Sequence, residues 1–409
     1  MSKILLSLWW IFAWSAVAPA NATADAPSPA LTAAIADAVD YLTRNQLPNG
    51  EFIYRRHLDA RQYPYKNNLL RHSGTVYALG MARDFYARRG EVAAAQKIAA
   101  AIRHANGYLR KFIAPVAGEK EILAVWTPRE LLDELAPRGS PVVAQLGGSA
   151  LGILALLAET GASDAAPDTA PENLATAQSL GRYLLSQQRA DGSFIAKITA
   201  GSHREDSFVS LYYPGQALLA LVELYRRDGD RRWLNAAIRG GKYLSLSREL
   251  SGDYPPDHWL LIAGERLLPV LPPVALWTRA EFFRQTRKIC EVILRAQLVD
   301  YALAGEYGAM RIGGQTAPTA TMAEGLLAAI NYLPPADAAL RARLQLAAAR
   351  AVRFLLRAQI KTGAERGGVP HSSTADLLRA APERRRAGEI RIDYVQHALS
   401  AFVRFAEME

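Results

Sequence analysis

The sequence predicts an all-α fold in which six helical hairpins close into a ring. A phrase that ends one helix occurs three times, as YLTRNQLPNGEF from Tyr41, as YLLSQQRADGSF from Tyr183 and, more divergent, as FLLRAQIKTGAERGG from Phe354. Each copy is followed by a crossover and a second helix rich in Ala and Leu. Hydrophobic alternation of period two is scarce. Self-similarity on this scale indicates stacked hairpins that share one core.

The helices are expected in alternating outer and inner positions. Six outer helices are expected to end near Tyr41-Leu42, Tyr108-Leu109, Tyr183-Leu184, Tyr243-Leu244, Ile293-Leu294 and Phe354-Leu355. Six inner helices are expected at His72 to Tyr86, Gly147 to Thr160, Tyr212 to Arg227, Asp257 to Leu268, Ala317 to Leu333 and Asp393 to Glu407.

Hydrophobic patterning assigns the two positions. LLALVELY, at 218–225, is apolar on most of its faces, which is typical of a buried inner helix. The segment 231–244 instead carries an apolar stripe interrupted by Arg and Lys, so it is expected on the outside. Strands are expected only as short pairs in the crossovers at 51–55 and 193–197.

The first residues predict a signal peptide. Lys3 precedes an apolar run at 4–17, and small residues at 18–22 provide a cleavage site. The alternative is an uncleaved membrane anchor, but the run is short for a span of about 20 residues. We therefore expect a signal peptide at 1–22, a flexible leader at 23–30, one toroidal domain at 31–409, and a periplasmic or secreted protein without a membrane span after cleavage.

Composition excludes several classes of function. The net charge of +9 is spread along the 409 residues, with no basic cluster beyond 383–386, so nucleic acid is not an expected partner. Cys290 is the single cysteine and lies in an apolar helical segment, so no intrachain disulfide can form and the thiol is expected to be inert. No metal, phosphate-loop or nucleophile-elbow motif is present, and we expect no metal and no cofactor.

The hairpin ALVELYRRDGDRRWLNAAIRGGKYL, together with the Gln-x-x-Asp-Gly-Ser-Phe phrase, resembles the (α/α)6 toroid enzymes. That superfamily contains six-hairpin glycosidases, unsaturated glucuronyl hydrolases and sugar epimerases of the N-acylglucosamine and heparosan-glucuronate kinds. The resemblance covers nearly the whole chain after the leader and implies an (α/α)6 toroid, but its motifs are structural. The same phrase is similar to the repeat of terpene cyclases, whose Asp-x-Asp-Asp motif this chain lacks.

In such a ring the N-terminal ends of the inner helices gather at one rim, so polar residues there are the site candidates. Glycoside hydrolysis usually needs two carboxyl groups, one as acid and one as base or nucleophile. The candidate catalytic carboxylates are Asp257, Asp206, Glu205 and Asp393. Asp257 and Asp393 are equally placed to be plain helix caps, and Glu205 and Asp206 to be solvated loop charges.

Aromatic, cationic and histidine side chains at the same rim are the candidate substrate-binding groups, since sugars are held by aromatic faces and polar groups together. They are Arg71, His72, Tyr212, Tyr213, His258, Trp259, His371 and His397. Arg71 could hold a substrate carboxylate bidentately. His72 and His397 could be general bases, although a lone buried histidine is more often structural. Four further polar residues of the rim receive no role: Ser149, Thr319, Thr321 and Glu324.

The function expected from these observations is an exported carbohydrate-active enzyme, first of all a glycoside hydrolase using a carboxylate pair. The partner would be an oligo- or polysaccharide, anionic glycans included. One alternative is an epimerase or lyase acting on uronic acids through histidine and Arg71. The other is a non-catalytic glycan-binding or envelope polysaccharide assembly protein.

Overall fold

A computed structural model describes residues 27–58, 67–132, 141–160, 170–201, 205, 207–299, 305–373 and 386–409. The expected signal peptide and Asp206 lie outside the described residues.

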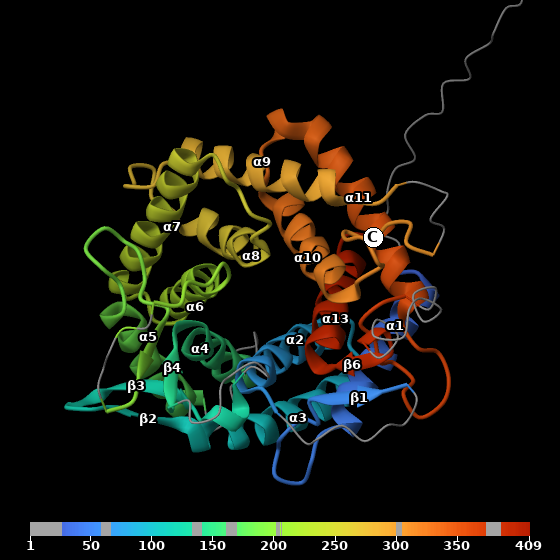
Figure 1. Cartoon of the computed structure of the whole chain (residues 1–409), viewed down its shortest axis with the longest axis horizontal. Coiled ribbons are helices and arrows are strands. Elements are labelled where there is room, and N and C mark those ends of the chain that lie inside the picture. Colours follow the sequence, from blue (N-terminus) through green and yellow to red (C-terminus); the bar gives the residue numbers. More distant parts are fainter. Residues whose placement is uncertain are drawn as a thin grey trace, which may run out of the picture.

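Twelve α-helices of the described residues form the predicted outer and inner sets (Figure 1). The outer helices are α1 (Pro29–Arg44), α3 (Val92–Leu109), α5 (Ala170–Ser186), α7 (Arg231–Ser251), α9 (Arg279–Ala296) and α11 (Ala338–Ala358). The inner helices are α2 (Leu69–Arg88), α4 (Leu146–Thr160), α6 (Tyr213–Asp228), α8 (His258–Leu267), α10 (Thr316–Tyr332) and α13 (Ile392–Ala406). Short 3-10 turns are η1 (Arg110–Phe112), η2 (Arg129–Leu131), η3 (Leu268–Val270) and η5 (Pro335–Asp337).

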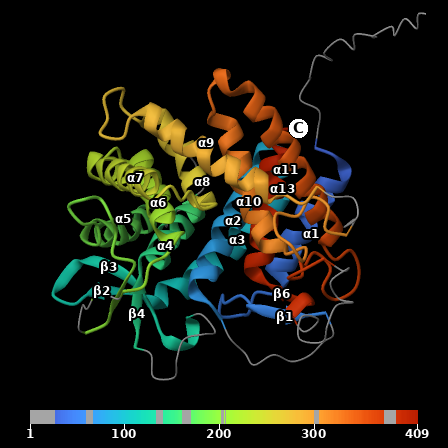
Figure 2. The same ribbon diagram turned by 45° about the horizontal axis from the view of Figure 1, so that its top comes forward.

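The inner helices close into a complete ring. Each packs against the next in the order α2, α4, α6, α8, α10, α13, and α13 then packs against α2. Figures 1 and 2 both show the last helix beside the first inner helix, with the outer helices around them. Closure buries the apolar ends that an open array of hairpins would expose. The prediction of an (α/α)6 toroid is confirmed.

Burial follows the predicted division. In α4, a helix hydrophobic on all sides, every residue except Ala158 is buried. In α7 the apolar stripe is buried, whereas positions such as Arg231, Asn235 and Arg239 are exposed. Cys290 lies buried in α9, and burial raises the pKa of its thiol to about 12, which keeps it protonated and unreactive at neutral pH.

The recurrent sequence phrase clamps one outer helix to the next. The side-chain amide of Gln46 donates to the Ala101 carbonyl of α3, and Gly50, at φ 92°, approaches α3 so closely that a Cβ would lie 2.1 Å from the His104 oxygen. Only glycine fits both constraints. Equivalent Gln and Gly pairs, each directed at the next outer helix, are Gln188 with Gly192, Gln297 with Gly308, and Gln359 with Gly367.

The strands line the crossovers. Strands β1 (Arg55–His57) and β6 (Glu389–Arg391) pair antiparallel, as do the four strands β2 (Ile113–Val116), β3 (Glu119–Thr127), β4 (Val143–Gln145) and β5 (Lys197–Thr199), in that order. Little strand was expected, and the β2–β3 hairpin was not predicted. The alternation of apolar and polar residues typical of a strand is absent there, because β3 packs against both α4 and α5 and the consecutive residues Ala124 and Val125 are both buried.

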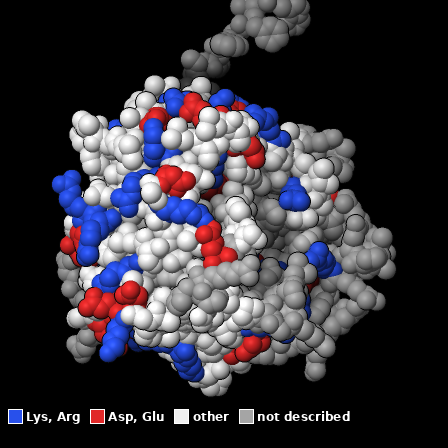
Figure 3. Space-filling model, turned by 60° about the vertical axis from the view of Figure 1, so that its left-hand side comes forward, with Lys and Arg blue, Asp and Glu red and all other residues white. Residues whose placement is uncertain are grey.

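The outer surface shows no concentration of one charge on the face that contains α5 and α7, where basic and acidic side chains are interspersed (Figure 3). Among the described helices, none combines the length and the apolar character required to cross a bilayer.

Candidate functional site

Three inner helices bring two histidines and a carboxylate together inside the ring. His258 is the first residue of α8, Glu324 lies within α10 and His397 lies in the second turn of α13. The His397 Nδ1 atom is 3.1 Å from Glu324 Oε1, and the His258 and His397 rings meet edge to face with centroids 5.5 Å apart. All three side chains are buried. We call this group the His–Glu–His cluster.

The orientation of His397 is set by its neighbours. Glu324 accepts the Nδ1 hydrogen bond, which leaves the Nε2 lone pair as an acceptor. The Gln396 amide lies 3.5 Å from Nε2 and is itself held by a hydrogen bond from the Thr75 hydroxyl, 2.8 Å long. Gly74 makes room for this amide, because a Cβ there would come within 2.7 Å of the Gln396 nitrogen.

His258 is the least constrained member of the cluster. Neither of its ring nitrogens has a hydrogen-bond partner among the described residues, although the side chain is buried. Burial, with smaller contributions from His397 and Arg71, holds the pKa of His258 well below its ordinary value. The imidazole is therefore neutral at neutral pH and presents a free lone pair, which is the form that a general base needs.

The cluster also has the composition of a metal site. One donor atom from each of His258, Glu324 and His397 lies within 4.8 Å of the others. Two histidines and a carboxylate can hold a divalent transition metal. We expected no metal because the sequence contains no local metal-binding motif. Donors that come from three separate helices lie far apart in the sequence and form no such motif.

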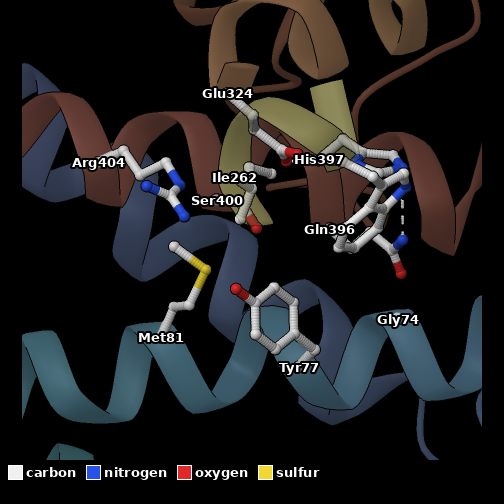
Figure 4. Close-up of a pocket in the computed structure, with 10 residues that line it drawn as sticks. Gly74, Tyr77, Met81, Ile262, Glu324, Gln396, His397, Ser400 and Arg404 are labelled. Carbon is white, nitrogen blue, oxygen red and sulfur yellow. Dashed lines mark hydrogen bonds and ion pairs between the residues drawn. The ribbon is translucent and has the colours of Figure 1, made fainter. Parts of the chain in front are cut away.

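The interior beyond the cluster is narrow. Tyr77, Met81, Ser400 and Arg404 line a cavity together with Glu324 and His397 of the cluster (Figure 4). Its volume is about 10 Å³ to the centre of a water molecule, room for about one water. Arg404 donates to Glu265 at 2.7 Å, which neutralises the buried charge at this end. Access to the cluster from this end is therefore limited to about one water, and the inner helices begin on the opposite side.

The ring of Tyr212 covers that approach. It lies edge-on to the His258 ring, with centroids 5.0 Å apart, and is half-buried directly before α6. Trp259 flanks the cluster on α8, with its ring 6.4 Å from that of His397. The structure thus brings together Tyr212, His258, Trp259 and His397 from the sequence candidates.

The two candidate carboxylates at inner-helix starts are both engaged. Asp257 caps α8 by accepting from the Leu260 N–H at 3.1 Å, and its other oxygen accepts from Arg248 at 2.6 Å. Burial raises the pKa of Asp257, an effect that the Arg248 guanidinium only partly offsets. Asp393 accepts from Arg391 through both oxygens, at 2.8 and 2.7 Å. Burial alone would raise its pKa, but the nearby guanidinium groups outweigh it and lower the pKa.

The remaining candidates lie apart from the cluster or beside it. Glu205 is exposed and paired with Arg189. His72 faces outward, with Nε2 3.0 Å from the Ala105 carbonyl of α3, and burial lowers its pKa to about 4. Tyr213 accepts a hydrogen bond from Gln145 at 2.7 Å.

Two further candidates lie where α13 begins. His371 contacts Tyr394 on α13 and, through Nδ1, the hydroxyl of Ser372 at 2.9 Å. Arg71 lies in the first turn of α2, with Nε 3.5 Å from Asp393.

Two residues that shape the cluster had no predicted role. Gln396 was not among the rim residues, and Glu324 was placed at the rim without a function. The available signal was a single acid in the otherwise apolar segment AEGLLAAINY, where an isolated charge needs a buried partner. The partner of Glu324, His397, is 73 positions away.

Solved structures with the same fold are carbohydrate enzymes. The chain is similar to a D-mannose isomerase at 12% identity and TM-score 0.63, covering 93% of this chain and 97% of the other. It is similar to the cellobiose 2-epimerase of Bacillus thermoamylovorans B4167 at 13% identity and TM-score 0.63, with 93% and 99% covered. It is also similar to a cellulase of C. cellulolyticium at 11% identity and TM-score 0.58, with 92% and 98% covered.

No protein-family model and no curated protein matches the chain. At these identities the structural likeness shows the fold alone. The expected resemblance to the six-hairpin toroid enzymes is confirmed at that level.

Proposed function

We propose that this protein is a carbohydrate-active enzyme that removes a proton from a sugar carbon, in the manner of an epimerase, isomerase or lyase. The observation that carries the proposal is His258, a buried, neutral imidazole with no hydrogen-bond partner among the described residues, in contact with a second histidine that a carboxylate orients. A general base and an oriented proton carrier are the parts that such chemistry requires. The isomerase and epimerase with the same fold support this class.

In this proposal each member of the cluster has a role. His258 takes the proton, since its lone pair is free and it lies nearest to the Tyr212 approach. Glu324 holds His397 in the tautomer with a free Nε2. The two rings are in contact, so no sugar carbon fits between them, and both act from the same side of the substrate. His397 positions the His258 ring through this edge-to-face contact.

Glycoside hydrolysis is the second candidate, and Asp257 favours it, because its raised pKa is the property of a general acid. Its two oxygens, however, are occupied by Arg248 and by the helix N-terminus. The raised pKa follows from burial, and a carboxyl group fixed in this way has no oxygen left for a leaving group. We therefore rank proton transfer first.

The test is proton exchange in deuterated water with a panel of neutral aldoses, uronates and their oligosaccharides, followed by proton NMR. The wild-type protein is expected to exchange one carbon-bound proton. His258→Gln should slow exchange by about 10² to 10⁴. His104→Gln, which changes an exposed histidine on outer helix α3, is the matched control and should exchange normally.

Other outcomes would reject the proposal. New reducing ends without exchange would favour hydrolysis, and binding without any reaction would favour the glycan-binding alternative. Exchange that persists in His258→Gln would exclude this histidine as the base. A chelator distinguishes the metal alternative, because exchange by histidines alone should survive prolonged treatment with EDTA.

A further inference from the structure

Arg71 presents an unused guanidinium fork beside the cluster. Its one close carboxylate contact runs from Nε to Asp393 Oδ2 at 3.5 Å, too long for a good hydrogen bond. Both oxygens of Asp393 are already bound by Arg391, so Arg71 is the second cation on a single carboxylate. Its two terminal amino groups have no hydrogen-bond partner in the described part of the chain, and its side chain is 33% exposed.

A second cation acts on the same tyrosine as Arg71. Arg311 is exposed and has no ion pair with the described residues. Burial and Asp257 raise the pKa of Tyr212, while the guanidinium groups of Arg71 and Arg311 act in the opposite direction. Tyr212 in turn contacts His258.

The nearby acidic side chains do not neutralise the positive charge of Arg71 and Arg311, because each of them is already paired. Asp257 is held by Arg248 and by the start of α8, and Asp393 is held by Arg391. Glu389, on β6 before α13, is paired with Arg55 at 3.2 Å and accepts from the Tyr394 hydroxyl. The N-termini of α2, α8 and α13 add partial positive charge at this rim. The approach to His258 is therefore electropositive.

Resting on the proposed function, we infer that the substrate is a sugar carrying a carboxylate, a uronic acid residue, whose carboxylate binds the fork of Arg71 with its ring against Tyr212. A planar fork matches a carboxylate with two parallel hydrogen bonds, which a neutral hydroxyl cannot supply. Arg311 contributes further positive charge near Tyr212.

The chemistry of His258 agrees with this substrate. The hydrogen on C5 of a uronate is adjacent to the carboxylate, so when the C5–H bond breaks the electron pair is delocalised onto the carboxylate as an enediolate. The proton goes to His258, and Arg71 stabilises the charge that develops. Return of a proton from His258 to the same face of C5 completes an exchange, whereas delivery of a proton from water to the opposite face inverts C5. Cleavage of the C4–O4 bond, in which O4 leaves with its substituent and takes up a proton from protonated His258 or from water, forms a C4–C5 double bond instead.

The experiment is calorimetric titration of the full mature chain with glucuronate and galacturonate oligosaccharides, with the matching neutral oligosaccharides, and with a hexose 6-phosphate. Uronates should bind the wild-type protein at least about tenfold more tightly than the neutral sugars. Arg71→Met should remove that preference. Arg71→Lys, which keeps the charge but not the fork, should retain only part of it. Arg353→Met is the matched control, because Arg353 is exposed on outer helix α11 and its loss changes the net charge equally.

The inference fails if uronates and neutral sugars bind equally, if Arg353→Met weakens uronate binding as much as Arg71→Met, or if only the phosphate binds. The last result would make the rim a phosphate site. Because titration needs no turnover, the two proposals are separable. Uronates that bind through Arg71 without exchange at C5 would overturn the proposed function alone. A neutral aldose that exchanges through His258, with no uronate binding, would overturn this inference alone.

Discussion

Replacement of Asp257 distinguishes a structural from a catalytic carboxylate at the start of α8. The side chain is fully buried, caps the helix through Leu260 and pairs with Arg248, whose own side chain is 7% exposed. Asp257→Ala removes both interactions and leaves a buried guanidinium without its carboxylate. Asp257→Asn keeps an oxygen for the cap and removes only the charge.

The magnitudes follow from these contacts. Loss of a helix cap costs about 1 kcal/mol, and removal of one partner of a buried ion pair costs about 3 to 5 kcal/mol. Asp257→Ala should therefore lower the free energy of unfolding by about 4 to 6 kcal/mol, and Asp257→Asn by about 3 kcal/mol. The double variant Arg248→Met/Asp257→Asn removes both charges and should return to within about 1 to 2 kcal/mol of the wild type.

Urea unfolding followed by circular dichroism measures this series, with the slope against urea compared between variants. The order wild type, double variant, Asp257→Asn, Asp257→Ala supports the structural role. If Asp257→Asn instead unfolds at the wild-type urea concentration yet abolishes glycan cleavage, then Asp257 is a catalytic acid and the hydrolase prediction is correct.

Three other predictions test separate parts of the structure. The pKa of His72 is about 4 in the folded chain and about 6.5 for an unperturbed histidine, so the unfolded state binds more protons between these pH values. The contribution of His72 to the free energy of unfolding is therefore intact above pH 6.5 and should fall by about 3 kcal/mol as the pH drops to 4. His72→Gln should remove that loss when unfolding is measured as a function of pH. Gly241→Ala should lower the free energy of unfolding by about 1 to 3 kcal/mol, because the new Cβ would lie 2.1 Å from buried Trp277. Gly107→Ala is the control: it has open space around it on outer helix α3 and should stabilise the protein slightly in the same thermal unfolding assay. Tyr212→Ala should expose His258 and increase its rate of modification by diethyl pyrocarbonate, and an unchanged rate would show that Tyr212 does not cover it.

The ring was predictable because its determinants are local. Each Gln-and-Gly phrase forms one clamp between neighbouring outer helices. Because every clamp makes the same contacts, every copy requires the same residues, and the sequence shows a repeat. The apolar character of inner helices such as α4 is likewise visible along a single segment. Strand β3 was missed because packing against α4 and α5, and not alternation, determines which of its residues are buried.

The candidate site was predictable only in part. Proximity to the start of an inner helix selected His258 and His397. It gave Glu324 no role, because the importance of this carboxylate follows from a contact between α10 and α13. It also gave equal weight to His72, which lies at a similar sequence position but faces α3. Packing between hairpins determines which face of a helix points into the ring, and this cannot be inferred from the sequence of one helix alone.

The two ends of the described chain meet at α1, which packs against α13 and is clamped to α11. Gln359 donates to the Ala34 carbonyl, and the Ser28 N–H donates to the Glu409 carboxylate at 2.9 Å. A short peptide linker could therefore connect the C-terminus to the beginning of α1 without crossing the ring. New termini could then be opened in another surface loop, giving a circular permutant that starts with a different hairpin. In such a molecule the order of synthesis would change while every contact around the circle stayed the same.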